Sequence, residues 1–105
     1  MRPKCMAHET LVGLDITDDP VYQSYREAMI PILTRYGGGF RYDLRVSEVL
    51  KSESDAGNIN RLFIIYFPDR AAKDAFFSDA EYTQVRKQFF EPSVSAVTIL
   101  AEYDR

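Results

Sequence analysis

Few side chains in this chain can carry acid–base or nucleophilic chemistry. His8 is the only histidine and Cys5 the only cysteine among 105 residues. A base that removes a proton from an acidic substrate would be a carboxylate or this histidine, so Asp43 and His8 are the candidate catalytic residues. We expect His8 to be exposed, because it lies at the start of the first predicted strand. One His and one Cys cannot complete a zinc site, so we predict no bound metal.

Aromatic side chains are far more abundant than catalytic ones. The chain has seven Tyr and seven Phe but no Trp. Tyrosine hydroxyls in an apolar cavity form a binding site for a small aromatic or oxygenated molecule. The predicted ligand-binding residues are Tyr22, Tyr25, Arg41, Asp43, Tyr66, Phe76 and Tyr82. The alternative is that these rings only fill the core, and the sequence leaves both possibilities open. We predict no organic cofactor.

The first third of the chain predicts a strand followed by a helix. Residues 7–17 alternate as a strand does, and Pro20 suits the first position of the helix that follows. Tyr22 and Tyr25 belong to the apolar stripe of this helix. Glycines 37–39 should end it, because glycine accepts the left-handed cap conformation. A phosphate-binding loop is not favoured, since such glycines precede a helix rather than follow one.

The rest of the chain predicts three more strands and further helical turns. The strands are residues 40–50, 61–67 and 93–103. Asp69 should cap a short helix, and Ser78 should open the next one as part of a capping box. Simple alternation along the second strand predicts two faces. One face would carry Phe40, Tyr42, Leu44 and Val46, and the other Arg41, Asp43 and Arg45.

This order of elements predicts an α+β protein with the ferredoxin-like βαββαβ fold. Both strand–helix–strand units should cross over right-handed, giving an antiparallel four-stranded sheet with helices on one face. The length is that of a single domain, residues 1–105. We expect residues 1–6 at its start to be disordered.

The stretch "RLFIIYFPD", residues 61–69, is apolar on both faces of its strand. Helices cover only one face of the predicted sheet. Burying one large apolar side chain is worth about 1.5–3 kcal/mol, and a whole domain has a net stability of only about 5–15 kcal/mol. The uncovered face therefore predicts a homodimer in which the two open sheet faces meet.

Composition argues against several classes of partner. The net charge is −3, which gives no mean attraction to nucleic acids or anionic membranes. RNA-recognition domains share the strand order, but their glycine-bearing motif on the third strand is missing. No apolar run approaches the ~18 residues of a membrane helix. We therefore predict neither a nucleic-acid nor a membrane partner. The single cysteine favours a cytoplasmic location.

Several motifs together resemble a known family. They are Asp19-Pro20 with Tyr22 and Tyr25, "RYGGG", and "FPDRAAKDAFFSDAEY" with Arg86 beyond it. Over residues 10–103 the chain is similar to small bacterial proteins grouped as a domain of unknown function. That family belongs to the dimeric α+β barrel superfamily, with antibiotic-biosynthesis monooxygenases and muconolactone isomerases among its relatives. The resemblance implies a dimeric α+β barrel.

The second strand departs from the family pattern. Family members often carry an arginine followed by two glycines there, whereas this chain has Asp43, Leu44 and Arg45. If that arginine binds a ligand in the family, Arg41 or Arg45 would take this role in the present chain.

Three functions follow as hypotheses. The leading one is a homodimer that binds a small molecule in each subunit. The second is a cofactor-independent monooxygenase or isomerase, and the third is an interaction protein with no ligand.

Overall fold

The computed structural model describes residues 7–53 and 57–105. Cys5 and the predicted disordered residues 1–6 lie outside the described part. The helices and strands are β1 (His8–Ile16), α1 (Asp19–Arg35), β2 (Gly39–Arg45), β3 (Arg61–Phe67), α2 (Arg70–Ser78), α3 (Ala80–Val85), the π-helical turn η1 (Arg86–Phe90), α4 (Glu91–Ser93) and β4 (Val94–Asp104).

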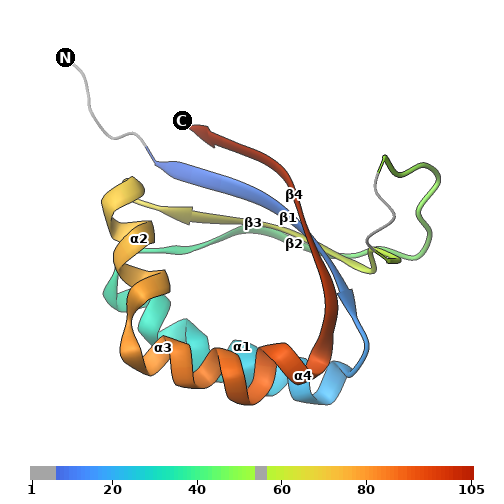
Figure 1. Ribbon diagram of the computed structural model, residues 1–105. Coiled ribbons are helices and arrows are strands. Elements are labelled where there is room, and N and C mark those ends of the chain that lie inside the picture. The colour runs from blue at the N-terminus through green and yellow to red at the C-terminus, as the bar shows by residue number, and fades with distance from the viewer. Residues whose placement is uncertain (1–6, 54–56) are drawn as a thin grey trace.

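The four strands form one antiparallel sheet with the order β2-β3-β1-β4. All helical segments lie on one side of this sheet, and no helix of the described residues covers the other side (Figure 1). The predicted ferredoxin-like βαββαβ fold, with helices on one face, is confirmed. The two edges of the sheet are β2 and β4, while β1 and β3 are central.

The ends of α1 follow from its flanking residues. The Asp18 carboxylate accepts a hydrogen bond from the Val21 backbone N–H at 3.2 Å, which satisfies one of the unpaired donors of the first turn. At the other end Gly37 has a φ of 77°, and its N–H donates to the Thr34 carbonyl at 3.0 Å. The predicted glycine termination is therefore confirmed, because this φ is costly for any residue with a Cβ.

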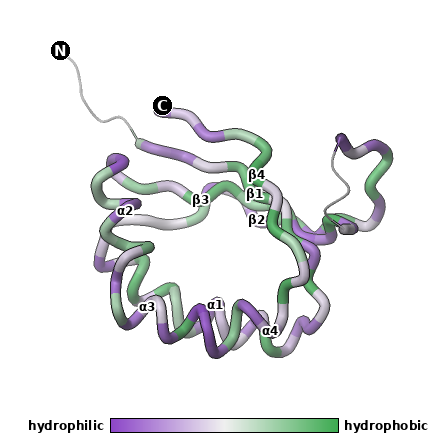
Figure 2. The backbone as a smooth tube through the Cα atoms, in the orientation of Figure 1, coloured by the Kyte–Doolittle hydropathy of each residue, from purple (hydrophilic) through white to green (hydrophobic). Residues whose placement is uncertain are grey.

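The core lies between the sheet and the helices. The helical segments alternate between hydrophobic and hydrophilic residues along the tube (Figure 2), as expected of helices with one buried side. None of the helices in the described ranges is long and apolar enough to span a membrane. The buried apolar residues are Val12, Leu14, Ile16, Tyr22, Tyr25, Met29, Ile32, Leu33, Phe63, Ile65, Phe67, Phe76 and Tyr82.

The predicted start of α3 is wrong by one residue. Ser78 is the last residue of α2, and Asp79 is the N-cap of α3. The Asp79 carboxylate accepts from the Tyr82 backbone N–H at 2.9 Å and from the Tyr36 hydroxyl at 2.6 Å. Because Asp79 is the residue with an extended backbone, its side chain, and not that of Ser78, reaches the first turn.

The predicted faces of β2 are also wrong. The pairing of β2 with β3 shifts between Phe40 and Tyr42, which leaves Arg41 as a bulge. One extra residue reverses the alternation that follows it. Phe40 and Asp43 therefore both face the helices, while Tyr42 and Leu44 face the open side. The strand ends at Arg45, five residues before the predicted end.

Replacing Asp79 by Ala should lower the free energy of unfolding by about 1–2 kcal/mol, because α3 loses its cap. Replacing Ser78 by Ala should change that free energy by less than about 0.5 kcal/mol. Urea denaturation followed by circular dichroism measures both values. Equal losses in the two variants would contradict the assignment of the cap to Asp79.

Candidate functional site

A cavity of about 470 Å³ lies between the sheet and the helices. Its size falls in the range of small-molecule sites in proteins. The sheet supplies an apolar floor, formed by Val12, Leu14, Phe40, Phe63 and Ile65. Helix α1 contributes Met29 and three polar side chains to the opposite wall. The cavity is therefore mainly apolar, with polar groups concentrated on the helix side.

The mouth of the cavity is formed by its more exposed lining residues. Phe77 is 43% exposed, Val97 46% and Ile99 55%. The Arg86 side chain, on η1, is also about half exposed. These residues come from the edge strand β4 on one side and from α2 and η1 on the other. A small molecule can therefore enter between β4 and the helices.

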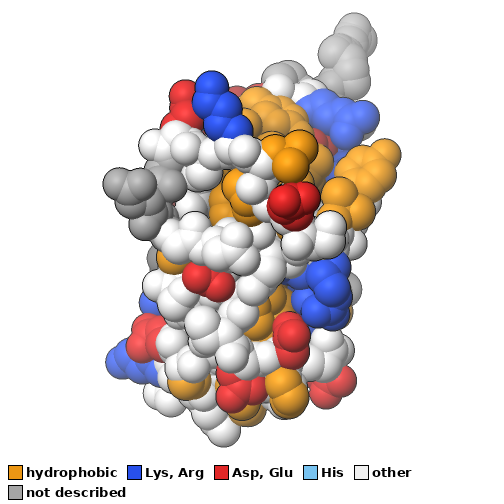
Figure 3. Space-filling model, turned by 90° about the vertical axis from the view of Figure 1, so that its right-hand side faces the viewer, with side chains coloured by type: hydrophobic (Ala, Val, Ile, Leu, Met, Phe, Trp, Pro, Cys, Tyr) orange, Lys and Arg blue, Asp and Glu red, His pale blue; other side chains and the backbone are white. Residues whose placement is uncertain are grey.

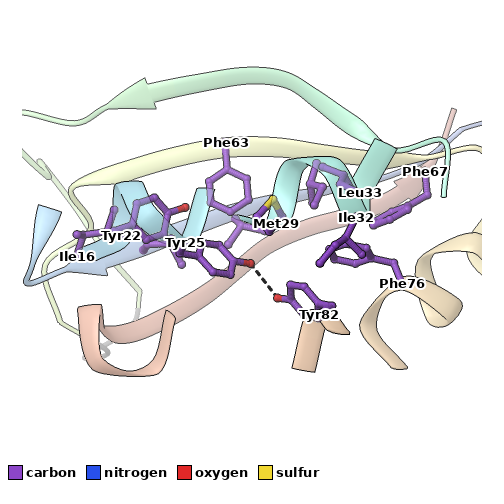
Figure 4. Close-up of a cluster of buried hydrophobic side chains, with 13 residues drawn as sticks. Ile16, Tyr22, Tyr25, Met29, Ile32, Leu33, Phe63, Phe67, Phe76 and Tyr82 are labelled. Carbon is purple, nitrogen blue, oxygen red and sulfur yellow. Dashed lines mark hydrogen bonds between the residues drawn. The ribbon is translucent and has the colours of Figure 1, made fainter. Parts of the chain in front are cut away.

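Two tyrosine hydroxyls meet inside the cavity. The Tyr25 and Tyr82 oxygens lie 2.8 Å apart, and Figure 4 shows the bond between α1 and α3. Burial raises the pKa of Tyr82, and it raises the pKa of Tyr25 well above its ordinary value. Both hydroxyls are therefore neutral near pH 7. Their mutual bond uses one of their two hydrogens, so the other can be donated to a bound molecule.

A buried arginine forms the second polar point of the cavity. Arg26 is only 6% exposed. Its Nε donates to the Tyr22 hydroxyl and its Nη1 to the Asp43 carboxylate, each at 2.8 Å. The guanidinium also lies over the Phe40 ring, 4.1 Å from its centroid. Aromatic and acidic neighbours together stabilise a charge that burial alone would penalise.

Asp43 is shared between two arginines. Arg61 donates to it from Nε at 2.7 Å and from Nη2 at 2.9 Å, so both arginines contact both oxygens of the carboxylate. These hydrogen bonds, with that of Arg26, lower the pKa of Asp43 to about 2, although burial opposes the shift. A carboxylate held this way is a weak base near pH 7. One carboxylate also leaves one of the two arginine charges without compensation.

The cavity brings together three of the predicted ligand-binding residues. Tyr22, Tyr25 and Tyr82 all line it. Asp43 lies behind Arg26 and does not line the cavity. Phe76 is fully buried in the core and packs against Tyr82, with ring centroids 4.3 Å apart.

The other two predicted ligand-binding residues lie on the opposite face of the sheet. The Arg41 guanidinium is 3.9 Å from the centroid of the Tyr66 ring, and its Nε donates to Glu9 at 2.9 Å. The bulge at Arg41 separates this side chain from that of Asp43, because the reversed alternation after it turns Asp43 toward the helices while Arg41 stays on the open face. The expected convergence of Arg41, Asp43 and Tyr66 around one cavity is therefore not observed.

The expectation of an exposed His8 is wrong. His8 is 1% exposed, because its strand is central and β4 extends beside it. Nδ1 lies 2.8 Å from an Asp104 oxygen and Nε2 lies 2.7 Å from a Glu102 oxygen. The two carboxylates thus lie beside the two nitrogens of the imidazole ring, one at each. Lys73 also binds Glu102 and, together with His8, lowers the Glu102 pKa to about 2. His8 does not line the cavity.

Sequence analysis missed the arginines of the cavity. Arg26 lies within the apolar stripe of α1, directly after Tyr25. A charged residue at a buried position of a helix is rare, and it could have indicated a functional role for Arg26. Arg61 opens an otherwise apolar strand. Arg86 and Phe90 line the cavity from η1, where the Glu91 N–H bonds to the Arg86 carbonyl in the π-helical pattern. No feature of the local sequence predicts this π-helical turn.

Across the described ranges, no group of three or more His, Cys, Asp and Glu side chains is arranged to hold a metal ion. The polar groups of the cavity are hydroxyls and guanidinium groups, which donate hydrogen bonds to anions and carbonyl oxygens.

Comparison with known proteins agrees with this fold. Residues 10–103 match the family described as "Domain of unknown function (DUF1330)". No curated protein matches the chain at a significant level.

Three solved structures illustrate the likeness. The RPA0582 protein of unknown function from Rhodopseudomonas palustris has a TM-score of 0.79 at 16% identity, over 95% of this chain and 82% of that one. A dimeric ferredoxin-like protein of unknown function from Jannaschia has a TM-score of 0.54 at 15% identity, over 93% and 97%. A candidate antibiotic biosynthesis monooxygenase from Nitrosomonas europaea has a TM-score of 0.55 at 12% identity, over 98% and 92%. The predicted resemblance to a family of unknown function is confirmed by the family match, and the solved structures confirm the ferredoxin-like fold.

The Asp43 contacts predict a specific pH dependence. The folded state lowers the Asp43 pKa from 3.8 to about 2. Ionised Asp43 should therefore stabilise the fold above about pH 4, and this contribution should disappear as the pH falls toward 2. We expect Asp43→Asn to be less stable than wild type near pH 7, with a difference that shrinks over that window. Urea denaturation at several pH values measures it.

The control for this experiment is Asp74→Asn, which removes the same charge from an exposed position of α2. A stability difference for Asp43→Asn that stays constant down to pH 2, or that matches the control, would contradict the role given to the Asp43 pairing.

Proposed function

The chain belongs to the DUF1330 family, and we propose that it is a homodimer that binds a small aromatic or oxygenated molecule in the cavity of each subunit. The cavity carries this proposal: it has an apolar floor, an open mouth and hydroxyl and guanidinium donors on one wall. We place the protein in the cytoplasm, as its single cysteine predicts.

Support for the dimer comes from the open face of the sheet. Tyr42 is 66% exposed and Leu44 52%, on strand β2. Their partners across β3 are Ile64 and Leu62, which continue the apolar surface. Figure 3 shows hydrophobic side chains reaching the surface mainly in the upper half of the view, which holds the sheet in Figure 1. Two such faces meeting would remove this surface from water.

The binding role is favoured over base catalysis. A cofactor-independent monooxygenase or isomerase needs a base beside its substrate. Asp43 is occupied by two arginines, and both nitrogens of His8 face carboxylates outside the cavity. A purely structural role is disfavoured, because a protein without a ligand would be expected to fill this space with its own side chains.

The dimer can be tested with a charge on the open face. Wild type should sediment at micromolar concentration as a particle of twice 12.1 kDa. Leu44→Glu should sediment near 12.1 kDa, because two like charges would face each other across the two-fold axis. The control is Leu50→Glu, a change at an 89% exposed position in the β2–β3 loop. A monomeric wild type would refute the dimer.

Ligand binding can be tested by thermal denaturation with a panel of phenols, quinones and small acids. A specific ligand should raise the melting temperature progressively as its concentration rises above its Kd. Ile99→Trp should abolish this rise by blocking the mouth, whereas Ile30→Trp, on the exposed side of α1, should preserve it. A panel with no effect on wild type, or the same effect on both variants, would reject the cavity as the site.

A further inference from the structure

We propose that the ligand is a planar monoanion, an aromatic or enolic acid, whose anionic group binds Arg86 and Tyr82 at the mouth while its ring lies inside the cavity. This inference rests on the proposed function and adds the chemical class and the orientation of the bound molecule.

The first argument is the charge around the cavity. Among the described lining residues, the charged ones are Arg26 and Arg86, and neither is a carboxylate. Behind them, Asp43 pairs with Arg26 and Arg61, and Glu91 accepts from Arg86 at 3.0 Å. Three arginines are thus balanced by two carboxylates. The site has an excess positive charge although the chain as a whole carries −3, and one negative charge on the ligand would neutralise it.

The second argument places the anionic group at the mouth. Arg26 is buried and already donates to both Tyr22 and Asp43. Arg86, in contrast, is half exposed and pairs with a half-exposed Glu91, a contact of the kind that contributes little stability. Its guanidinium can therefore rearrange to meet an incoming anion at small cost. An anion at the mouth also keeps part of its hydration, so its desolvation costs less than deep inside.

Tyr82 is the neutral donor beside Arg86. The two residues are one turn apart on the α3–η1 segment, and both line the cavity. Burial raises the pKa of Tyr82, and the Arg86 charge lowers it by a smaller amount. Because the Tyr25–Tyr82 pair retains one unshared hydrogen, Tyr82 can donate to the same anion while Tyr25 donates to Tyr82. A carboxylate or enolate oxygen accepts from both partners, which is the geometry of a charge-assisted site.

The third argument concerns the shape of the ligand. The π-helical turn η1 brings both Arg86 and Phe90 to the cavity. The Phe90 ring lies 5.0 Å from that of Tyr25 and 6.5 Å from that of Tyr22, so this wall consists of flat rings. Phe63 lies on the sheet across from Tyr22 and Tyr25 (Figure 4). Aromatic walls on two sides favour a planar ring through stacked or edge contacts.

The test compares two probes of equal shape. The probes are 2-naphthoate, which is anionic, and 2-naphthamide, which is neutral, and isothermal titration calorimetry measures the Kd of each for the full chain. In wild type the acid should bind about tenfold or more tightly than the amide. In Arg86→Gln this preference should fall to about twofold or less, while the Kd of the amide should change little.

The matched control is Arg35→Gln. Arg35 also forms an exposed pair with a glutamate, Glu81 at 2.7 Å, but it does not line the cavity. This variant changes the net charge equally and should keep the wild-type preference for the acid.

Three outcomes overturn the inference. Equal Kd values of acid and amide in wild type would reject the anionic class, whereas a preference for the acid that survives in Arg86→Gln would reject Arg86 as the group that binds the anion. Either result leaves binding in the cavity intact. Failure of both probes to bind wild type would reject aromatic acids as ligands. The proposed function would then be tested separately, by thermal denaturation with the panel of phenols, quinones and small acids. The variant Tyr82→Phe provides a second test. A weaker preference for the acid, with an unchanged Kd for the amide, would identify the Tyr82 hydroxyl as the neutral donor.

Discussion

One extra residue in β2 determines how both faces of the sheet are used. Because Arg41 is a bulge, Asp43 turns toward the helices and there binds Arg26 of α1 and Arg61 of β3. Without this bulge the guanidinium of Arg26 would be buried with no carboxylate beside it, a costly arrangement. The pairing therefore ties α1 to the sheet and fixes a cation at one end of the cavity. It also neutralises the Arg26 charge, which the rings of Phe40 and Phe63 alone could not do.

The same bulge organises the open face. Arg41, turned to that side, binds Glu9, which is fully buried although it lies on the face without helices. Tyr103 donates to the other oxygen of Glu9 at 2.8 Å. The charged groups of this face are thus satisfied within one subunit at one end of the strands, while Tyr42 and Leu44 stay exposed. A self-contained polar cluster beside an apolar surface is well suited to contact a second copy, since no charge then needs a partner across the interface.

The sequence predicted the features that depend on local patterns. The pattern of apolar residues predicted the strands, and Pro20 and the glycines at 37–39 predicted the two ends of α1. The shared stripe of α1 predicted that Tyr22 and Tyr25 lie side by side. Apart from the cap of α3, which was predicted one residue too early, the errors arose where pairing between distant segments decides the outcome. A bulge depends on how β2 aligns with β3, so Arg41 and Asp43 were expected on one face although they lie on opposite faces of the sheet. The burial of His8 depends on β4, whose residue Asp104 pairs with it from 96 residues further along the chain. The local sequence does not contain this information, so His8 was expected to be exposed.

The arrangement of polar atoms explains why binding is a better account of the cavity than catalysis. Donors dominate its polar wall: the guanidinium groups of Arg26 and Arg86 can only donate, and the Tyr25–Tyr82 pair keeps one hydrogen to give. A base for proton abstraction must instead accept, and the carboxylates nearest the cavity, Asp43 and Glu91, already accept from arginines. Donors without a competing acceptor stabilise an oxygen that is already negative. Such a wall therefore suits a molecule that arrives ionised, in keeping with the proposed binding role, which requires no proton transfer.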